Sequence, residues 1–129
     1  MFPPPLDLLR EGCGGTEAHP AAVGLQFLIG AGNLMGRGVF TYVAETRHGV
    51  NENALIVGPT AIGRKGDAGN LALAAFEDIA PDWFASITGG LSTGEGLIHA
   101  VRDPVQGHKR DGPEIEIDAG VGDKRLLCL

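Results

Sequence analysis

The chain has 129 residues, enough for one ordinary domain with a hydrophobic core. Hydrophobic residues make up 43% and charged residues 20%, a balance typical of globular proteins that excludes wholesale disorder. The net charge of -6 excludes the broad basic field that non-specific nucleic-acid binding requires, so only local pairs such as Arg64-Lys65 could contact phosphate.

Cysteine and hydropathy patterns bear on the compartment. Cys13 and Cys128 are too few for a disulfide framework, and the four histidines lack the spacing of metal ligands. No secretory signal is visible, and the most apolar stretch, 21–36, is shorter than the roughly 20 residues that a membrane-spanning helix needs. These features predict a cytoplasmic chain with no membrane partner.

The first predicted elements are an arm and a helix. Residues 1–19 are rich in proline and glycine, which predicts an extended N-terminal arm. Pro20 can open a helix that runs to about Met35, and its nearly all-round apolar surface predicts a helix buried on every side. Glycines within it suggest the close approach of another segment: Gly24, Gly30 and Gly32.

Strands and helices are expected to alternate along the rest of the chain. Strands are predicted at 39–44, 54–57, 85–88 and 124–129, and helices at 68–80 and 92–102. The segment 105–123 reads as a long loop, with a short exposed strand as an alternative at 114–118. The wholly apolar run 54–57 is expected to be a central strand buried on both faces. This order predicts an α/β fold with a mainly parallel sheet flanked by helices.

The run 54–57 begins a stretch with the order strand, glycine-rich loop, helix, and a phosphate-binding loop lies in such a stretch. Gly58 and Gly63 have the spacing of the pattern G-x-x-x-x-G-K-[ST], but Arg64 stands before Lys65. Asp67 takes the place of the hydroxyl residue that would bind Mg2+. An ordinary glycine-rich turn remains the alternative.

Five stretches of the sequence carry a family likeness. They are 26–33 (QFLIGAGN) with 36–37 (GR), 45–48 (ETRH), 57–60 (VGPT) with 63–66 (GRKG), 90–98 (GLSTGEGLI) with 100–103 (AVRD), and 123–127 (DKRLL). In order and spacing they resemble a family of RecA-like P-loop proteins of bacterial phages, plasmids and mobile elements. Members of this family are uncharacterised or described as the helicase-like part of primase–helicase replication proteins.

The resemblance implies a partial RecA-like P-loop NTPase domain at 20–129, lacking the C-terminal part of the family domain. It implies an ATP-binding module of a DNA replication or helicase-like protein, with ATP and Mg2+ as cofactors. DNA would be contacted through a larger assembly, with the rest of the domain or other subunits. The implied nucleotide-binding residues are Gly58, Pro59, Thr60, Gly63, Arg64, Lys65, Gly66 and Asp67.

Two departures from the family argue against hydrolysis. The family has Thr or Ser where this chain has Asp67, and the acidic residue expected after the last strand would come after Leu129. We therefore expect no efficient hydrolysis by this chain alone. The alternative is a truncated, catalytically inactive remnant that acts only as a binding or interaction module.

Individual residues keep two interpretations. Lys65 either contacts the terminal phosphates, as the resemblance implies, or is a solvated lysine, while Arg64 either reaches a phosphate oxygen or pairs with Asp67. Asp67 either caps the helix and weakens nucleotide binding or binds Mg2+ itself. Binding would be weakened because a carboxylate about 4 Å from a phosphate costs around 4 kcal/mol at an effective dielectric near 20. Glu95 either activates the attacking water, as the resemblance implies, or completes a capping box with Ser92.

Overall fold

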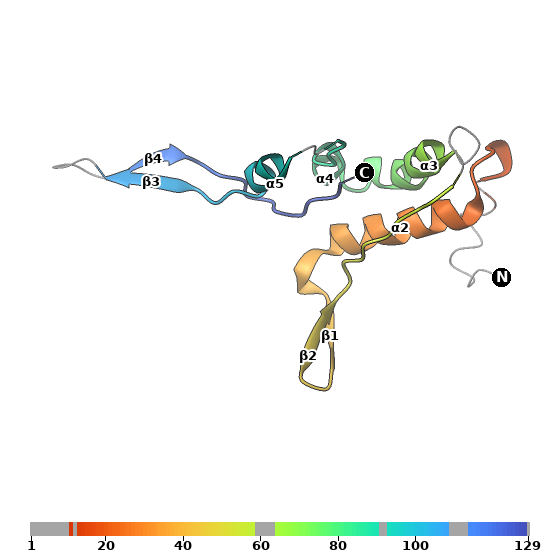
Figure 1. The fold of residues 1–129 in the computed structure, drawn as a ribbon, viewed down its shortest axis with the longest axis horizontal. Helices are drawn as coiled ribbons and strands as arrows, with labels where there is room; N and C mark the ends of the chain where they lie inside the picture. Colours follow the sequence, from red (N-terminus) through yellow and green to blue (C-terminus); the bar gives the residue numbers. More distant parts are fainter. Residues whose placement is uncertain (1–10, 12, 59–63, 91–92, 109–113, 129) are drawn as a thin grey trace. The chain divides into compact units, whose positions relative to one another are not determined.

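The structure, a computed structural model, describes residues 11, 13–58, 64–90, 93–108 and 114–128. It consists of two compact units, Met1–Ser86 and Ile87–Leu129, each described by itself (Figure 1). The first contains η1 (Cys13–Gly15), α2 (Pro20–Met35), η2 (Gly36–Gly38), β1 (Phe40–Val43), β2 (Thr46–Gly49), α3 (Lys65–Glu77) and α4 (Pro81–Ala85). The second contains α5 (Gly94–Ala100), β3 (Val105–His108) and β4 (Glu114–Asp118).

The predicted mainly parallel, RecA-like sheet is wrong. In the described ranges the strands form two separate two-stranded antiparallel sheets, β1–β2 and β3–β4, with one isolated parallel bridge between Thr88 and Cys128. A short apolar run becomes a strand only where a neighbouring strand satisfies its backbone groups. Here each strand pairs with its neighbour in sequence, which produces hairpins rather than parallel crossovers.

Three predicted strands fail for this reason. Residues 54–57 belong to no strand, and Leu55 and Val57 are 87% and 82% exposed. In the predicted strand at 85–88, Ala85 is the last residue of α4, a short helix that opens with Pro81, and only Thr88 makes a bridge. The C-terminal segment contributes only its partner, Cys128. In contrast, β4 confirms the alternative strand at 114–118, and the first part of the predicted loop is β3.

Helix α2 confirms the predicted bounds, and its ends explain them. The His19 Nδ1 atom accepts a hydrogen bond from the Ala21 N–H at 3.2 Å, and Pro20 takes the first helical position, where no N–H is needed. At the other end Gly36 has φ 65°, a conformation that favours glycine, and its N–H caps the last turn. The prediction of burial on every side is wrong, because Leu28 and Met35 are 49% and 50% exposed.

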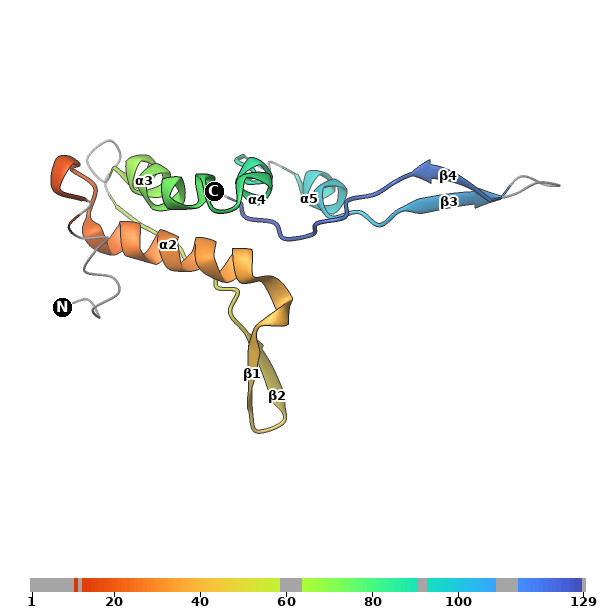
Figure 2. The same cartoon turned by 180° about the vertical axis from the view of Figure 1, so that it is seen from behind.

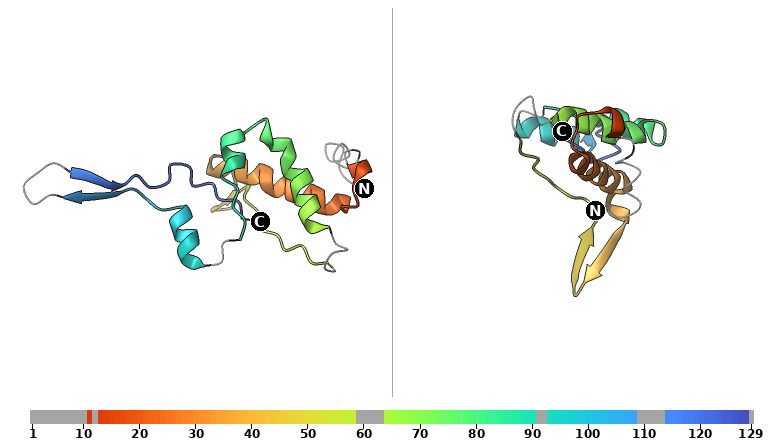
Figure 3. Two further views of the ribbon diagram at one scale, coloured as in Figure 1. Left: turned by 90° about the horizontal axis from the view of Figure 1, so that it is seen from above. Right: turned by 90° about the vertical axis from the view of Figure 1, so that its right-hand side faces the viewer.

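The core of the first unit lies where α3 packs on α2 (Figures 2 and 3). A Cβ atom at Gly30 would lie 3.0 Å from Leu73 Cδ2 and 3.2 Å from Phe76 Cε2, so glycine allows the two helices to approach. At Gly32 it would overlap the carbonyl oxygen of Val50. The close packing predicted from these two glycines is therefore confirmed. The buried side chains of this cluster are Cys13, Ala18, Val23, Ala68 and Ala72, so part of the expected arm belongs to the core.

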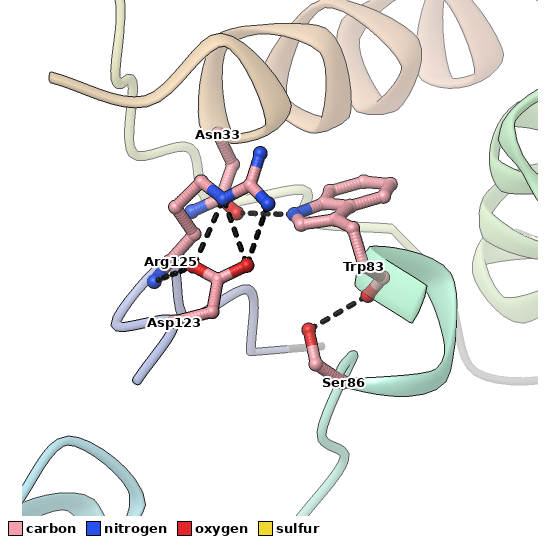
Figure 4. Close-up of polar contacts among 5 residues, drawn as sticks. All are labelled: Asn33, Trp83, Ser86, Asp123 and Arg125. Carbon is pink, nitrogen blue, oxygen red and sulfur yellow. Dashed lines mark hydrogen bonds and ion pairs between the residues drawn. The ribbon is translucent and has the colours of Figure 1, made fainter. Parts of the chain in front are cut away.

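Aromatic packing joins α4 to this core. The Phe76 ring stacks on Phe27 at 5.0 Å and meets the Trp83 ring edge-on at 5.5 Å. Trp83 is 2% exposed, and its indole N–H donates to Asn33 Oδ1 at 2.9 Å (Figure 4). The Ser86 hydroxyl donates to the Trp83 carbonyl at 2.7 Å. Trp83 is thus a core residue.

The β1–β2 hairpin turns through Ala44 and Glu45, and Ala44 has φ 51°. All its strand residues are exposed.

The second unit is held by the Arg102–Asp118 ion pair, with Arg102 Nε 2.7 Å from Asp118 Oδ2. This side-chain hydrogen bond lowers the pKa of Asp118, as does the bond from the Gly120 N–H. The Thr88 N–H donates to the Leu127 carbonyl at 3.0 Å, which ties the start of the unit to its end.

Candidate functional site

The best candidate site is the first turn of α3 together with Gly58, which we call the phosphate segment (Gly58 and Arg64–Asp67). The helix begins at Lys65, three residues earlier than predicted, so Lys65, Gly66 and Asp67 form its first turn. Arg64 is the N-cap residue, with left-handed φ 41° and ψ 38°, and its side chain makes no capping hydrogen bond. The first turn of a helix is favourable for an anion, because its N–H groups and dipole point outward there.

Arg64 carries two carboxylate partners. Its guanidinium lies 2.8 Å from Glu17 Oε2 and 3.6 Å from Asp67 Oδ2, and its side chain is 49% exposed. The predicted Arg64–Asp67 pairing is therefore present. Glu17 was missed by sequence reasoning, because a contact across 47 residues leaves no local signal.

Lys65 folds back over the segment. Its ammonium donates to the Gly58 carbonyl oxygen at 3.3 Å, and this contact is exposed to solvent. The backbone of Lys65 is anchored to α2, since Gln26 Nε2 donates to its carbonyl oxygen at 3.3 Å. The contact with Gln26 is possible because residue 69 is glycine: a Cβ there would lie 2.6 Å from Gln26 Oε1.

The structure describes only part of the predicted loop. Pro59, Thr60 and Gly63 lie outside the described residues. Gly66 is exposed, and a Cβ atom at this position would meet no heavy atom of the described residues within 4 Å.

Glu95 belongs to the second unit, whereas the phosphate segment belongs to the first. The predicted capping box is one residue out of register, because the N-cap of α5 is Thr93, whose hydroxyl accepts from the Gly96 N–H at 3.1 Å. The capping-box position three residues after this N-cap is occupied by Gly96 rather than Glu95. Ser92 lies outside the described residues.

Two further features of the described residues, their metal-ligating side chains and their helices, bear on metal binding and on the membrane. Within those ranges, no three His, Cys, Asp or Glu residues are grouped so that they could hold a metal ion. Asp67 is the acidic residue of the first turn of α3. None of the helices in the described part of the chain is long and apolar enough to span a membrane.

Comparison with protein-family models, with curated proteins and with solved structures finds no match for this chain.

Proposed function

We propose that the phosphate segment binds the phosphate groups of a nucleotide such as ATP, and that this chain alone does not hydrolyse it efficiently. The observation that carries the proposal is the hydrogen bond that the Lys65 ammonium donates to the Gly58 carbonyl oxygen 3.3 Å away. An incoming phosphate would replace that neutral acceptor by a charged one, which strengthens the hydrogen bond. The open first turn of α3 supplies N–H donors beside it.

The same geometry predicts weak binding. Glu17 and Asp67 already neutralise Arg64, so a phosphate must compete with two carboxylates for that guanidinium. The first turn of α3 contains Asp67 in place of a hydroxyl residue that could hold Mg2+. We therefore expect binding that depends little on Mg2+, and no turnover.

The test is a calorimetric titration of the full chain with ATP, with and without Mg2+, alongside a phosphate-release assay. Lys65→Ala should weaken binding at least about tenfold, because a charge-assisted hydrogen bond contributes about 1.5–3 kcal/mol. Lys124→Ala removes an equal charge from the second unit and serves as the matched control. Absence of ATP binding, or equal affinity of both variants, would refute the proposal.

The wider role implied by the family resemblance, a module of a DNA replication or helicase-like protein, remains part of this proposal. Rapid Mg2+-dependent hydrolysis by the chain would contradict the expected lack of turnover and favour an active ATPase.

A second candidate is an interaction module without catalysis. It is favoured by large apolar side chains on the surface of the first unit: Tyr42 is 63% exposed, Leu55 87% and Val57 82%. A partner that covers these side chains would remove their apolar area from water. Light scattering across a concentration series distinguishes this candidate from nucleotide binding. An interaction module should associate with rising concentration, and the association should survive Lys65→Ala.

A further inference from the structure

The β1–β2 hairpin has one face on which two aromatic rings and a guanidinium meet. In the observed register Tyr42 lies opposite Arg47, and Phe40 lies opposite Gly49. Because directly opposed residues and residues two apart share a face, Phe40, Tyr42 and Arg47 lie together. We call these three residues the hairpin face. Thr41 and His48 occupy the other side.

The hairpin face is ordered by its own contacts. The Phe40 and Tyr42 rings meet edge-to-face at 5.6 Å, and the Arg47 guanidinium carbon lies 4.0 Å from the centre of the Phe40 ring. Arg47 also donates through Nη2 to the Arg37 carbonyl oxygen, which restricts its side chain further. Despite these contacts Phe40 is 45% and Tyr42 63% exposed. Two neighbouring aromatic rings are thus fixed in solvent next to a cation.

Charge indicates the partner. The hairpin and η2, residues 36–49, contain Arg37 and Arg47 against the one carboxylate of Glu45, so this segment is positive in a chain of net charge -6. Bases stack on aromatic side chains, and guanidinium groups bind phosphates and stack on bases. An anionic strand with exposed bases therefore complements both the rings and the charge. A buried apolar partner would complement only the rings and would have to desolvate the guanidinium.

We propose that the hairpin face binds single-stranded nucleic acid, with a base stacked on Tyr42 and the phosphates beside Arg47 and Arg37. The small positive segment limits the contact to few nucleotides, so binding is weak and sensitive to salt. This inference does not depend on the phosphate segment. Lys65→Ala should therefore leave it unchanged.

The direct test uses the wild-type chain. Tyr42 is the single tyrosine of the sequence, so its ring NMR signals can be followed during a titration with a short oligothymidine at low salt. Stacking should shift these signals upfield in a saturable manner. Unmoved Tyr42 signals at oligonucleotide concentrations that bind the chain would overturn the proposal, as would the absence of binding.

Variants test the chemistry by fluorescence anisotropy with the labelled oligothymidine. Tyr42→Ile keeps β-propensity and apolar bulk but removes the ring, and should weaken binding at least about fivefold. Arg47→Lys keeps the positive charge but removes the planar guanidinium. It provides a second test of the contact in case Tyr42→Ile disturbs the hairpin. Thr41→Val is the matched control on the opposite face and should retain wild-type affinity. Equal affinity of all three variants, or equally effective competition by duplex DNA and heparin, would refute the stacking contact.

Discussion

Asp67 offers the sharpest test of the phosphate segment. It is the third residue of α3, its side chain is 55% exposed, and Oδ2 lies 3.6 Å from Arg64 Nη1. Replacing Asp67 by Thr removes a negative charge from the position where a phosphate would bind and supplies a hydroxyl, the group that the phosphate-loop sequence pattern has after its lysine. It also releases Arg64 from one of its two carboxylates. Both effects should favour the anion.

The magnitude follows from distance and exposure. Unit charges about 4 Å apart interact by about 1 kcal/mol in water and about 4 kcal/mol at an effective dielectric of 20. Because the Asp67 side chain is more than half exposed, the lower figure applies. We expect Asp67→Thr to tighten ATP binding by about 1 kcal/mol, which is roughly fivefold in Kd.

The assay is calorimetric titration with ATP, with and without Mg2+. Asp67→Asn separates charge from hydroxyl: it should tighten binding in both conditions, whereas any additional gain of Thr should require Mg2+. Glu77→Gln is the matched control, because it removes the same charge ten residues further along α3. That is about 15 Å along the helix, beyond the screening length of about 8 Å.

Unchanged or weaker ATP affinity in both Asp67 variants would refute the repulsion argument. A loss confined to Mg2+-containing buffer would instead identify Asp67 as a metal ligand, the alternative that the sequence left open.

Three further predictions concern stability. Gly30→Ala should destabilise the first unit by about 1 kcal/mol, because the added Cβ meets packed side chains at 3.0–3.2 Å and the strain outweighs the gain in helix propensity. The control is Gly66→Ala, whose Cβ meets no atom of the described residues within 4 Å and which should be neutral or stabilising. Thermal unfolding by circular dichroism compares the two variants. Ala44→Gly should stabilise the hairpin by about 0.5–1 kcal/mol, since φ 51° strains alanine; weaker NMR evidence for β1–β2 pairing would contradict this. Arg102→Gln should return the pKa of Asp118 toward 3.8. Because the folded pKa lies below the unfolded one, the ion pair stabilises the fold above the unfolded pKa, and this stabilisation disappears as pH falls through the folded pKa. Titration of the Asp118 carboxyl by NMR measures the change, and an unshifted pKa in the wild-type chain would show that the ion pair is absent.

Local patterns were sufficient where the relevant interactions are local. Pro20 and the glycine at 36 delimit α2, the Ala/Leu-rich run yields α3, and the β-branched, aromatic stretch yields β1. Lys65 was correctly expected next to a helix start, but the prediction that Asp67 caps the helix is wrong, because α3 begins three residues earlier than its apolar periodicity suggested and its N-cap residue is Arg64. An apolar pattern locates the buried face of a helix, but the polar first turn has no such signal.

Strand pairing, in contrast, was decided by tertiary structure. The apolar composition of 54–57 is compatible with a central strand, yet no described strand lies beside it to accept its hydrogen bonds, and it remains exposed. The same holds for the site: neither the Glu17–Arg64 ion pair nor the meeting of Phe40, Tyr42 and Arg47 can be read from spacing alone. The sequence by itself determined where α2, α3 and α5 form, because capping and periodicity act within a few residues, but it did not predict α4. Which strands pair and which charges meet was decided only by the folded chain, because those contacts join residues that are distant in sequence or depend on the hairpin register.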